Sequence, residues 1–270
     1  MRKNEMVREL EKFGLQAKWE TVNKNGVLHT GIVMKSQGEM VAPIIYTDGL
    51  IDENDSLDRA VSKILAQYQK VKTENLDLNQ IISREYVLDH ITIAVQKDGI
   101  EEIVKRESGL CGIEAYLIVI DSSPAGNMSM KVSKELLKRC QVSECEAWER
   151  AEKNLHESIK IQSMSEVMAQ LMGSEFSERA FVDDMLYIIS TKSGVKGASA
   201  VLDSDTMKEF ARKHQTRRIT VLPSSIHEML LIPNTGGFNE AELSEMVKSV
   251  NETEVIPEER LTDRVYVLEF

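Results

Sequence analysis

The chain has 270 residues, 42% of them hydrophobic and 29% charged, so it can bury a core and is not disordered by composition. Its formal net charge of −11 disfavours nucleic acid and anionic membranes as partners, because binding to either normally begins with a basic surface. Three cysteines give no even disulfide framework, and the N-terminus lacks the apolar run of a secretory signal, so we expect a cytoplasmic protein without a membrane span.

Residues 1–75 predict a small N-terminal lobe with the order α-β-β-β-α. A short amphipathic helix is expected to end at Gly14, which can supply a left-handed stop. The stretch from Leu15 to Tyr46 contains the hairpin dipeptide Asn25-Gly26 and predicts three antiparallel strands. Ser56 is expected to cap the second helix.

Residues 84–270 predict a larger lobe, connected to the first through the polar segment from Val71 to Ser83. One compact unit that contains both lobes is the alternative. Alternating apolar residues from Tyr86 to Gln96 indicate a strand, and Asp98 to Arg106 is interpreted as a short helix. The apolar run from Tyr116 to Ile120 is typical of a buried strand.

Two capping boxes mark further helices in the larger lobe. Ser143-x-x-Glu146 and Ser163-x-x-Glu166 place a serine and a glutamate where they can satisfy the first amides of a helix. The whole pattern predicts an α+β protein whose larger lobe consists of antiparallel hairpins with covering helices. The remaining expected elements are a strand pair at Ile219–Leu222 and Met229–Ile232, a helix that begins at Asn239, and a terminal strand at Val265–Phe270.

A shift of 71 residues aligns two stretches of the larger lobe, with Tyr116 on Tyr187 and Ser133 on Ser204. Both read as an apolar strand, a glycine-containing turn, a second strand and a serine-capped helix. Few positions are identical, so shared patterning without common descent is the alternative. Our hypothesis is an internal β-β-α repeat whose two copies contribute to one sheet.

Several segments resemble a known family: Val22–His29 with Ala42–Tyr46, Glu146–Asn154 and Leu222–Glu228. The last of these, Leu-Pro-Ser-Ser-Ile-His-Glu, is the most specific. The family consists of bacterial proteins catalogued only as a domain of unknown function and found largely in gut-dwelling anaerobes, and the likeness spans nearly the whole chain. The resemblance implies an uncharacterised bacterial, cytoplasmic protein and transfers no catalytic residues.

The strongest candidate for chemistry is the polar cluster of Ser224, Ser225, His227 and Glu228 inside an apolar block. It could hold a nucleophile and a base for a hydrolase or transferase, but the acid of a triad would have to come from another strand. The alternative is a turn in which the serine hydroxyls satisfy backbone amides and His227 completes the network. We favour the turn.

The one basic concentration of the chain comprises Arg212, Lys213, His214, Arg217 and Arg218. It could hold an acidic partner or a phosphate. Cations at a helix C-terminus also complement the helix dipole and remain solvated, and this interpretation is the stronger one.

No pattern predicts a cofactor or a metal site. Cys140 and Cys145 have no second pair and so do not form a zinc ribbon. Paired carboxylates such as Asp183-Asp184 are mostly solvated faces, although this pair precedes a buried strand and could bind a cation. The leading hypothesis is therefore a non-catalytic binding or interaction protein with a protein or small-molecule partner. The rival hypothesis is a hydrolase or transferase whose site forms around Ser225 and His227.

Overall fold

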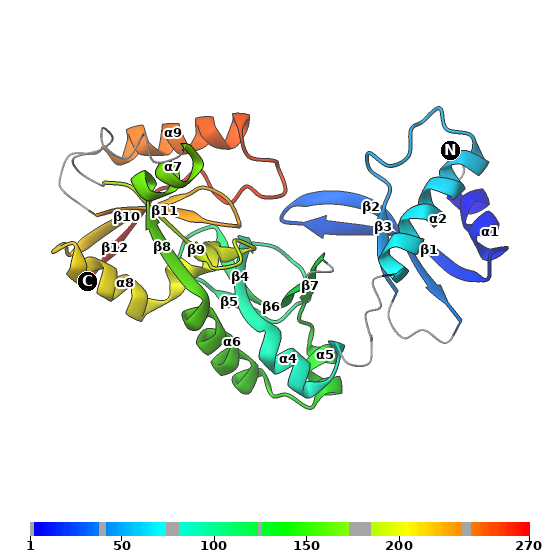
Figure 1. Cartoon of the computed structure of the whole chain (residues 1–270), viewed down its shortest axis with the longest axis horizontal. Helices are drawn as coiled ribbons and strands as arrows, with labels where there is room; N and C mark the ends of the chain where they lie inside the picture. Colours follow the sequence, from blue (N-terminus) through cyan, green and yellow to red (C-terminus); the bar gives the residue numbers. More distant parts are fainter. Residues whose placement is uncertain (1–2, 38–41, 74–80, 124–125, 173–184, 234–238) are drawn as a thin grey trace. The chain divides into compact units, whose positions relative to one another are not determined.

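The chain folds into two compact units, Met1–Ser83 (unit 1) and Arg84–Phe270 (unit 2), and each is described here by itself. Helices and antiparallel sheets occur in both, which confirms the predicted α+β class. No helix among the described residues is both long and apolar enough to cross a membrane. The structure is a computed structural model that describes residues 3–37, 42–73, 81–123, 126–172, 185–233 and 239–270 (Figure 1).

Unit 1 has the predicted order α-β-β-β-α. Its three strands form an antiparallel sheet in the order β1-β2-β3, and the two helices contribute to one core with the sheet. The elements are α1 (Lys3–Glu11), β1 (Leu15–Lys24), β2 (Val27–Ser36), β3 (Ile44–Tyr46) and α2 (Leu57–Thr73).

Local chemistry explains the turns and caps of unit 1. Asn25 and Gly26 join β1 to β2 with φ angles of 51° and 88°, the left-handed pair that a tight hairpin turn requires. The Ser56 hydroxyl accepts the backbone N–H of Arg59 at 3.3 Å, which confirms the predicted cap of α2. The core between sheet and helices contains buried side chains from every element, among them Met6, Leu10, Leu15, Ile32, Met34, Ile45 and Ile64.

The first sheet of unit 2 is antiparallel and has four strands. Its central strand β6 pairs with β4, with β5 and with β7. β6 contains the apolar run predicted as a buried strand. The elements of this part are α4 (Arg84–His90), β4 (Ile91–Lys97), β5 (Lys105–Glu107), β6 (Ile113–Ser123) and β7 (Gly126–Lys131).

Two predictions for this part are wrong. The first half of the expected strand Tyr86–Gln96 is helix α4, where Tyr86 stacks on His90 one turn later at 4.1 Å between ring centroids. The expected helix Asp98–Arg106 is absent, and β5 ends the segment instead. Val104 accepts the N–H of Leu117 and donates its own N–H to the carbonyl of Val132. Pairing with distant strands therefore overrides the local helical signal.

A second sheet of five antiparallel strands has the order β12-β10-β11-β9-β8. The predicted strand pair is present as β10 and β11, with Val221 opposite Leu231, and the terminal strand is present as β12. The strands are β8 (Ile159–Ser163), β9 (Tyr187–Thr191), β10 (Arg218–Pro223), β11 (Met229–Pro233) and β12 (Tyr266–Glu269).

Three helices of unit 2 begin at the predicted caps Ser143, Ser163 and Asn239. At α7 the capping box is reciprocal: Ser163 N–H donates to Glu166 and Glu166 N–H donates to the Ser163 hydroxyl, at 3.0 and 3.2 Å. At α6 only the serine half forms, because the Glu146 carboxylate binds Arg84. The helices are α5 (Lys134–Cys140), α6 (Glu144–Ser158), α7 (Met164–Met172), α8 (Ser204–Lys213) and α9 (Glu240–Thr253).

The proposed internal repeat is wrong. After β9 the chain forms a buried 3-10 helix, η2 (Gly197–Leu202), where the first copy has strand β7. The two segments also belong to different sheets. Ser199 is fully buried and donates to the Ile93 carbonyl at 2.6 Å, so η2 fills space against β4 and does not pair as a strand. The cap of α8 is Asp203, one residue before the predicted Ser204.

Candidate functional site

The four predicted site residues lie together in the loop 224–228, between β10 and β11. The Ser225 hydroxyl accepts the backbone N–H of His227 at 3.0 Å, and Ser225 N–H donates to the Glu228 carbonyl at 3.1 Å. The Ser224 hydroxyl donates to the Glu228 carboxylate at 3.4 Å. Within this loop the serine hydroxyls are therefore engaged by the loop's own backbone and carboxylate, not by the imidazole.

The imidazole of His227 has partners on both ring nitrogens. Lys196 N–H donates to Nδ1 at 3.1 Å, and Glu259 Oε1 lies 3.2 Å from Nε2. The Gly194 carbonyl also lies 3.2 Å from Nδ1, but a nitrogen that accepts the Lys196 N–H carries no proton to donate to it. We therefore place a ring proton on Nε2, directed at Glu259. Glu259 is an acid that sequence reasoning did not associate with this loop.

Close packing surrounds His227. Its carbonyl accepts the Ser190 hydroxyl at 2.7 Å. A Cβ added to Gly197 would lie 2.8 Å from the same carbonyl and would overlap Ser190 and Thr191, so only glycine fits there. A serine relay needs a ring nitrogen at bonding distance from the serine hydroxyl, and here the nitrogens face a backbone amide and a carboxylate.

The basic concentration of the sequence does not form one uniform patch. Arg218 pairs with Glu269 at 3.4 Å, and the Arg217 carbonyl accepts the backbone N–H of Phe270. His214 packs against the rings of Tyr187 and Phe210, with centroids at 4.6 and 4.3 Å. Burial, followed by the charge of the neighbouring lysine, lowers the pKa of His214 and favours its neutral form.

Residues considered for metal binding remain separate. Cys140 is buried, Cys145 is exposed, and neither is in a disulfide. Within the described ranges, no group of three His, Cys, Asp or Glu side chains is placed to hold a metal ion. Asp183 and Asp184 lie outside the described residues.

One face of the four-stranded sheet carries a charged network that the sequence analysis missed. Lys131 of β7 donates to Gln96 at 2.9 Å and binds Glu101. Gln96 donates to Glu114 at 2.7 Å, and Lys105 of β5 binds the same glutamate at 2.9 Å. Each cation has an anion and each buried amide has a partner, so the network fastens the segment after β4 to the sheet.

Tyr116 lies at the centre of this face and is 1% exposed. Lys131 Nζ lies 5.2 Å from its ring centroid. Burial, and then the charge of Glu101, raise the pKa of Tyr116, so the phenol stays protonated. The sequence signal for this face lies in β6, where Glu114, Tyr116 and Ile118 alternate and therefore point to the same side of the sheet.

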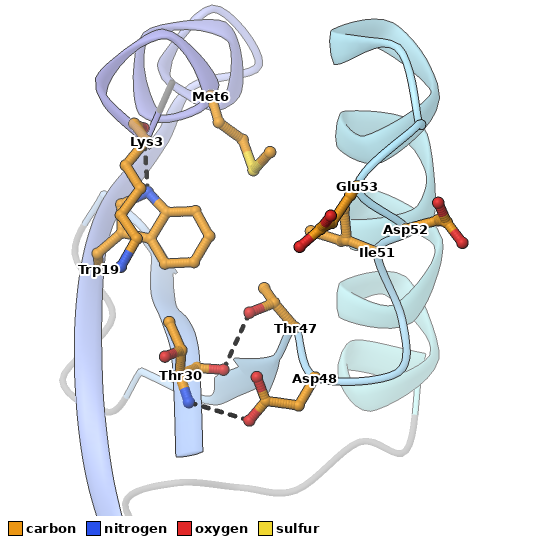
Figure 2. A pocket seen from close by; sticks show the side chains of 9 residues that line it. All are labelled: Lys3, Met6, Trp19, Thr30, Thr47, Asp48, Ile51, Asp52 and Glu53. Carbon is orange, nitrogen blue, oxygen red and sulfur yellow. Dashed lines mark hydrogen bonds between the residues drawn. The ribbon is translucent and has the colours of Figure 1, made fainter. Parts of the chain in front are cut away.

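Unit 1 contains a cavity of about 350 Å³ that the sequence analysis also missed. Figure 2 shows the indole of Trp19 on one side and the segment before α2 on the other. The floor is held by two hydrogen bonds to Thr30: its N–H donates to Asp48 at 3.1 Å and its carbonyl accepts the Thr47 hydroxyl at 3.0 Å. The lining residues are Lys3, Met6, Trp19, Thr30, Thr47, Asp48, Ile51, Asp52 and Glu53.

The cavity wall before α2 is fixed by Asp55. This carboxylate accepts the backbone N–H of Asp52 at 2.9 Å and binds Lys63 at 2.6 Å and Arg59 at 3.2 Å. The Lys63 hydrogen bond, followed by the Asp52 amide, lowers the pKa of Asp55. These bonds hold the segment that carries Glu53 against the start of the helix.

A family model for proteins of unknown function, DUF5688, matches residues 3–269. The chain belongs to this family. The resemblance read from Val22–His29 and Leu222–Glu228 is therefore confirmed at the level of a family of unknown function. The searches of curated proteins and of solved structures found no match. DUF5688 covers both units, so the cavity of unit 1 and the network of unit 2 both lie within the matched region.

Proposed function

We propose that this protein is a non-catalytic binding protein and that a small-molecule ligand enters the cavity of unit 1. The observation that supports the proposal is the composition of that cavity, in which Trp19, Met6 and Ile51 supply apolar walls and the other lining residues are polar or charged. Ligand sites in proteins commonly have volumes of about 300–1,000 Å³ and combine apolar surface with polar groups that orient the ligand. At about 350 Å³ the cavity suits a small molecule or one side chain of a partner.

The rival, a hydrolase or transferase centred on Ser225 and His227, has less support. These residues line neither the cavity of unit 1 nor a second cavity, in unit 2, whose lining includes Leu88 and Arg150. The ring nitrogens of His227 face Lys196 N–H and Glu259. A bacterial cytoplasm remains our proposed location. The absence of disulfides among Cys111, Cys140 and Cys145 supports a reducing compartment.

The binding proposal is tested by a fragment screen against the full chain, observed at the two tryptophan indole N–H signals in NMR spectra. Trp19 reports on unit 1 and Trp148 on unit 2, and the Trp148→Phe variant assigns the signals. We expect a subset of fragments to shift the Trp19 signal and leave the Trp148 signal unchanged. A broad screen in which no fragment moves Trp19 would overturn the proposal.

The enzyme alternative is tested with a fluorophosphonate probe, which labels activated serine nucleophiles. We expect no labelling that distinguishes the natural chain from Ser225→Ala. Labelling that is lost in both Ser225→Ala and His227→Asn, with folding unchanged, would show a working nucleophile and would favour the rival.

A further inference from the structure

We propose that the ligand of unit 1 is an organic cation with an apolar body, such as an alkylated ammonium group. This inference rests on the proposed function and names the class of ligand. Three carboxylates line the cavity, from Asp48, Asp52 and Glu53, against one ammonium group from Lys3. The local charge is therefore negative, although unit 1 as a whole is close to neutral.

The indole of Trp19 is held in a fixed position to receive a cation. Its Nε1–H donates to the Lys3 carbonyl at 3.0 Å, which ties β1 to the start of α1. The Lys3 ammonium lies 5.0 Å from the ring centroid. An ammonium within about 6 Å of an indole face is attracted by the ring quadrupole, so the chain already places one cation on this ring.

Glu53 is the carboxylate best placed to pair with a ligand. In Figure 2 its side chain points from the segment before α2 toward the Trp19 side of the cavity. No ion pair joins Glu53 to any other described residue. The other two carboxylates have partners in the chain: Asp48 accepts Thr30 N–H and lies 3.2 Å from His29, and Asp52 accepts Asn54 N–H at 2.9 Å.

The apolar part of the lining fits the body of such a cation. Met6 is fully buried, and Ile51 lies half-buried on the opposite wall. A trimethylammonium group carries its charge over methyl surfaces, so it can contact the Ile51 side chain and the Trp19 indole without losing a strong hydration shell. A doubly charged metal ion is strongly hydrated and would gain little binding energy from contact with the same apolar walls.

The experiment compares choline with 3,3-dimethylbutan-1-ol, in which carbon replaces the charged nitrogen. Each compound is titrated into the full chain and observed at the Trp19 indole signal. We expect choline to bind at least about fivefold more tightly than the isostere. Equal binding would overturn the cation inference and leave the binding proposal intact. If neither compound nor any other small molecule moves the Trp19 signal, both proposals fail.

Two variants change the cavity charge in opposite directions. Glu53→Gln should raise the choline Kd roughly threefold to tenfold, and Lys3→Met should lower it roughly twofold to fivefold, because each removes one charge within several ångströms of the bound cation. Glu11→Gln is the matched control, since it removes an exposed carboxylate of α1 that does not line the cavity. Equal effects of Glu53→Gln and Glu11→Gln on choline binding would contradict the proposed site.

Discussion

The two units differ in charge and in what they do with their charged side chains. Residues 1–83 contain 11 Lys or Arg and 12 Asp or Glu, a net of −1, whereas residues 84–270 contain 22 and 32, a net of −10. In unit 1, carboxylates such as Glu53 line an open cavity; in unit 2, Glu101 and Glu114 are bound by lysines on a sheet face. The net charge of the chain therefore describes unit 2, and local arrangement decides what unit 1 can bind.

The units also differ in how their cores are built. Among the residues that the structure describes, unit 1 has a single cluster between one sheet and two helices, and unit 2 has several clusters around two sheets. Each unit contains one tryptophan, Trp19 or Trp148, so the unfolding of each can be followed separately.

The largest expected effect is a loss of stability in unit 1 that leaves unit 2 unchanged. Ile32→Ala removes a fully buried side chain at the centre of the unit 1 sheet, and should lower the free energy of unfolding of unit 1 by about 2–5 kcal/mol. Urea unfolding followed by fluorescence should show the loss in a Trp148→Phe background, which reports Trp19. In a Trp19→Phe background the midpoint at Trp148 should stay unchanged, and an equal shift there would show that the units unfold as one.

The next effect concerns the charged network of unit 2. Lys131→Met leaves Glu101, 18% exposed, without its cation, and should cost about 1–3 kcal/mol, less than a fully buried pair because Lys131 is itself 29% exposed. The matched control is Lys153→Met, which removes an ion pair at 3.9 Å between side chains that are 63% and 64% exposed. We expect the control to change the unfolding free energy by less than about 0.5 kcal/mol. A similar cost for both would mean that the network adds nothing to stability.

A smaller effect should be similar in the two units. Ser56→Ala in unit 1 and Ser143→Ala in unit 2 each remove a hydroxyl that caps a helix, and each should cost about 1 kcal/mol. Thermal unfolding monitored at each tryptophan measures the two losses. Since both hydroxyls accept a single backbone N–H, a difference much larger than twofold would show that one cap also has a tertiary role.

The smallest expected effect is the pH dependence that His214 gives to the stability of unit 2. Folding lowers the pKa of His214, so the folded state binds this proton at a lower pH than the unfolded chain, which binds it as the pH falls below about 6.5. Acidification therefore stabilises the unfolded state, and the unfolding free energy of unit 2 should fall as the pH decreases from the ordinary histidine pKa through the lowered one. His214→Phe keeps an aromatic ring beside Tyr187 and should flatten this dependence, measured by urea unfolding at about pH 7.5 and 5.5. If the unfolding free energies of the natural chain and of His214→Phe changed equally with pH, the lowered pKa of His214 would be contradicted.

Sequence patterns succeeded where neighbours along the chain decide the structure. The Asn25-Gly26 turn, the caps at Ser56 and Ser163 and the strand pair β10–β11 were all predicted, because their signals lie within a few residues of one another. The same reasoning failed at Tyr86 to His90, where an alternating pattern forms a helix. There the Leu88 carbonyl accepts Asn154 at 3.0 Å, a partner that no local pattern contains.

The candidate sites also divide into parts with local sequence signals and parts that come from distant segments. Sequence reasoning found the polar loop 224–228, but the acid opposite His227 comes from Glu259, 32 residues later. The cavity of unit 1 was not predicted, because Trp19 and Glu53 belong to a strand and a loop whose patterns give no sign of each other. A cavity is a property of how elements pack, and packing is not periodic in sequence.

The sequence by itself determined the α+β class, the order of elements in unit 1, the turn and cap positions and the membership of a family of unknown function. These features depend on backbone conformation and on hydrogen bonds between residues close in the chain. Only the tertiary structure decided that η2 replaces a strand, that Lys131 joins Gln96 to Glu101, and that Trp19 faces a carboxylate-lined cavity. Each of these brings together groups from distant segments, whose mutual burial and pairing have no counterpart in local sequence.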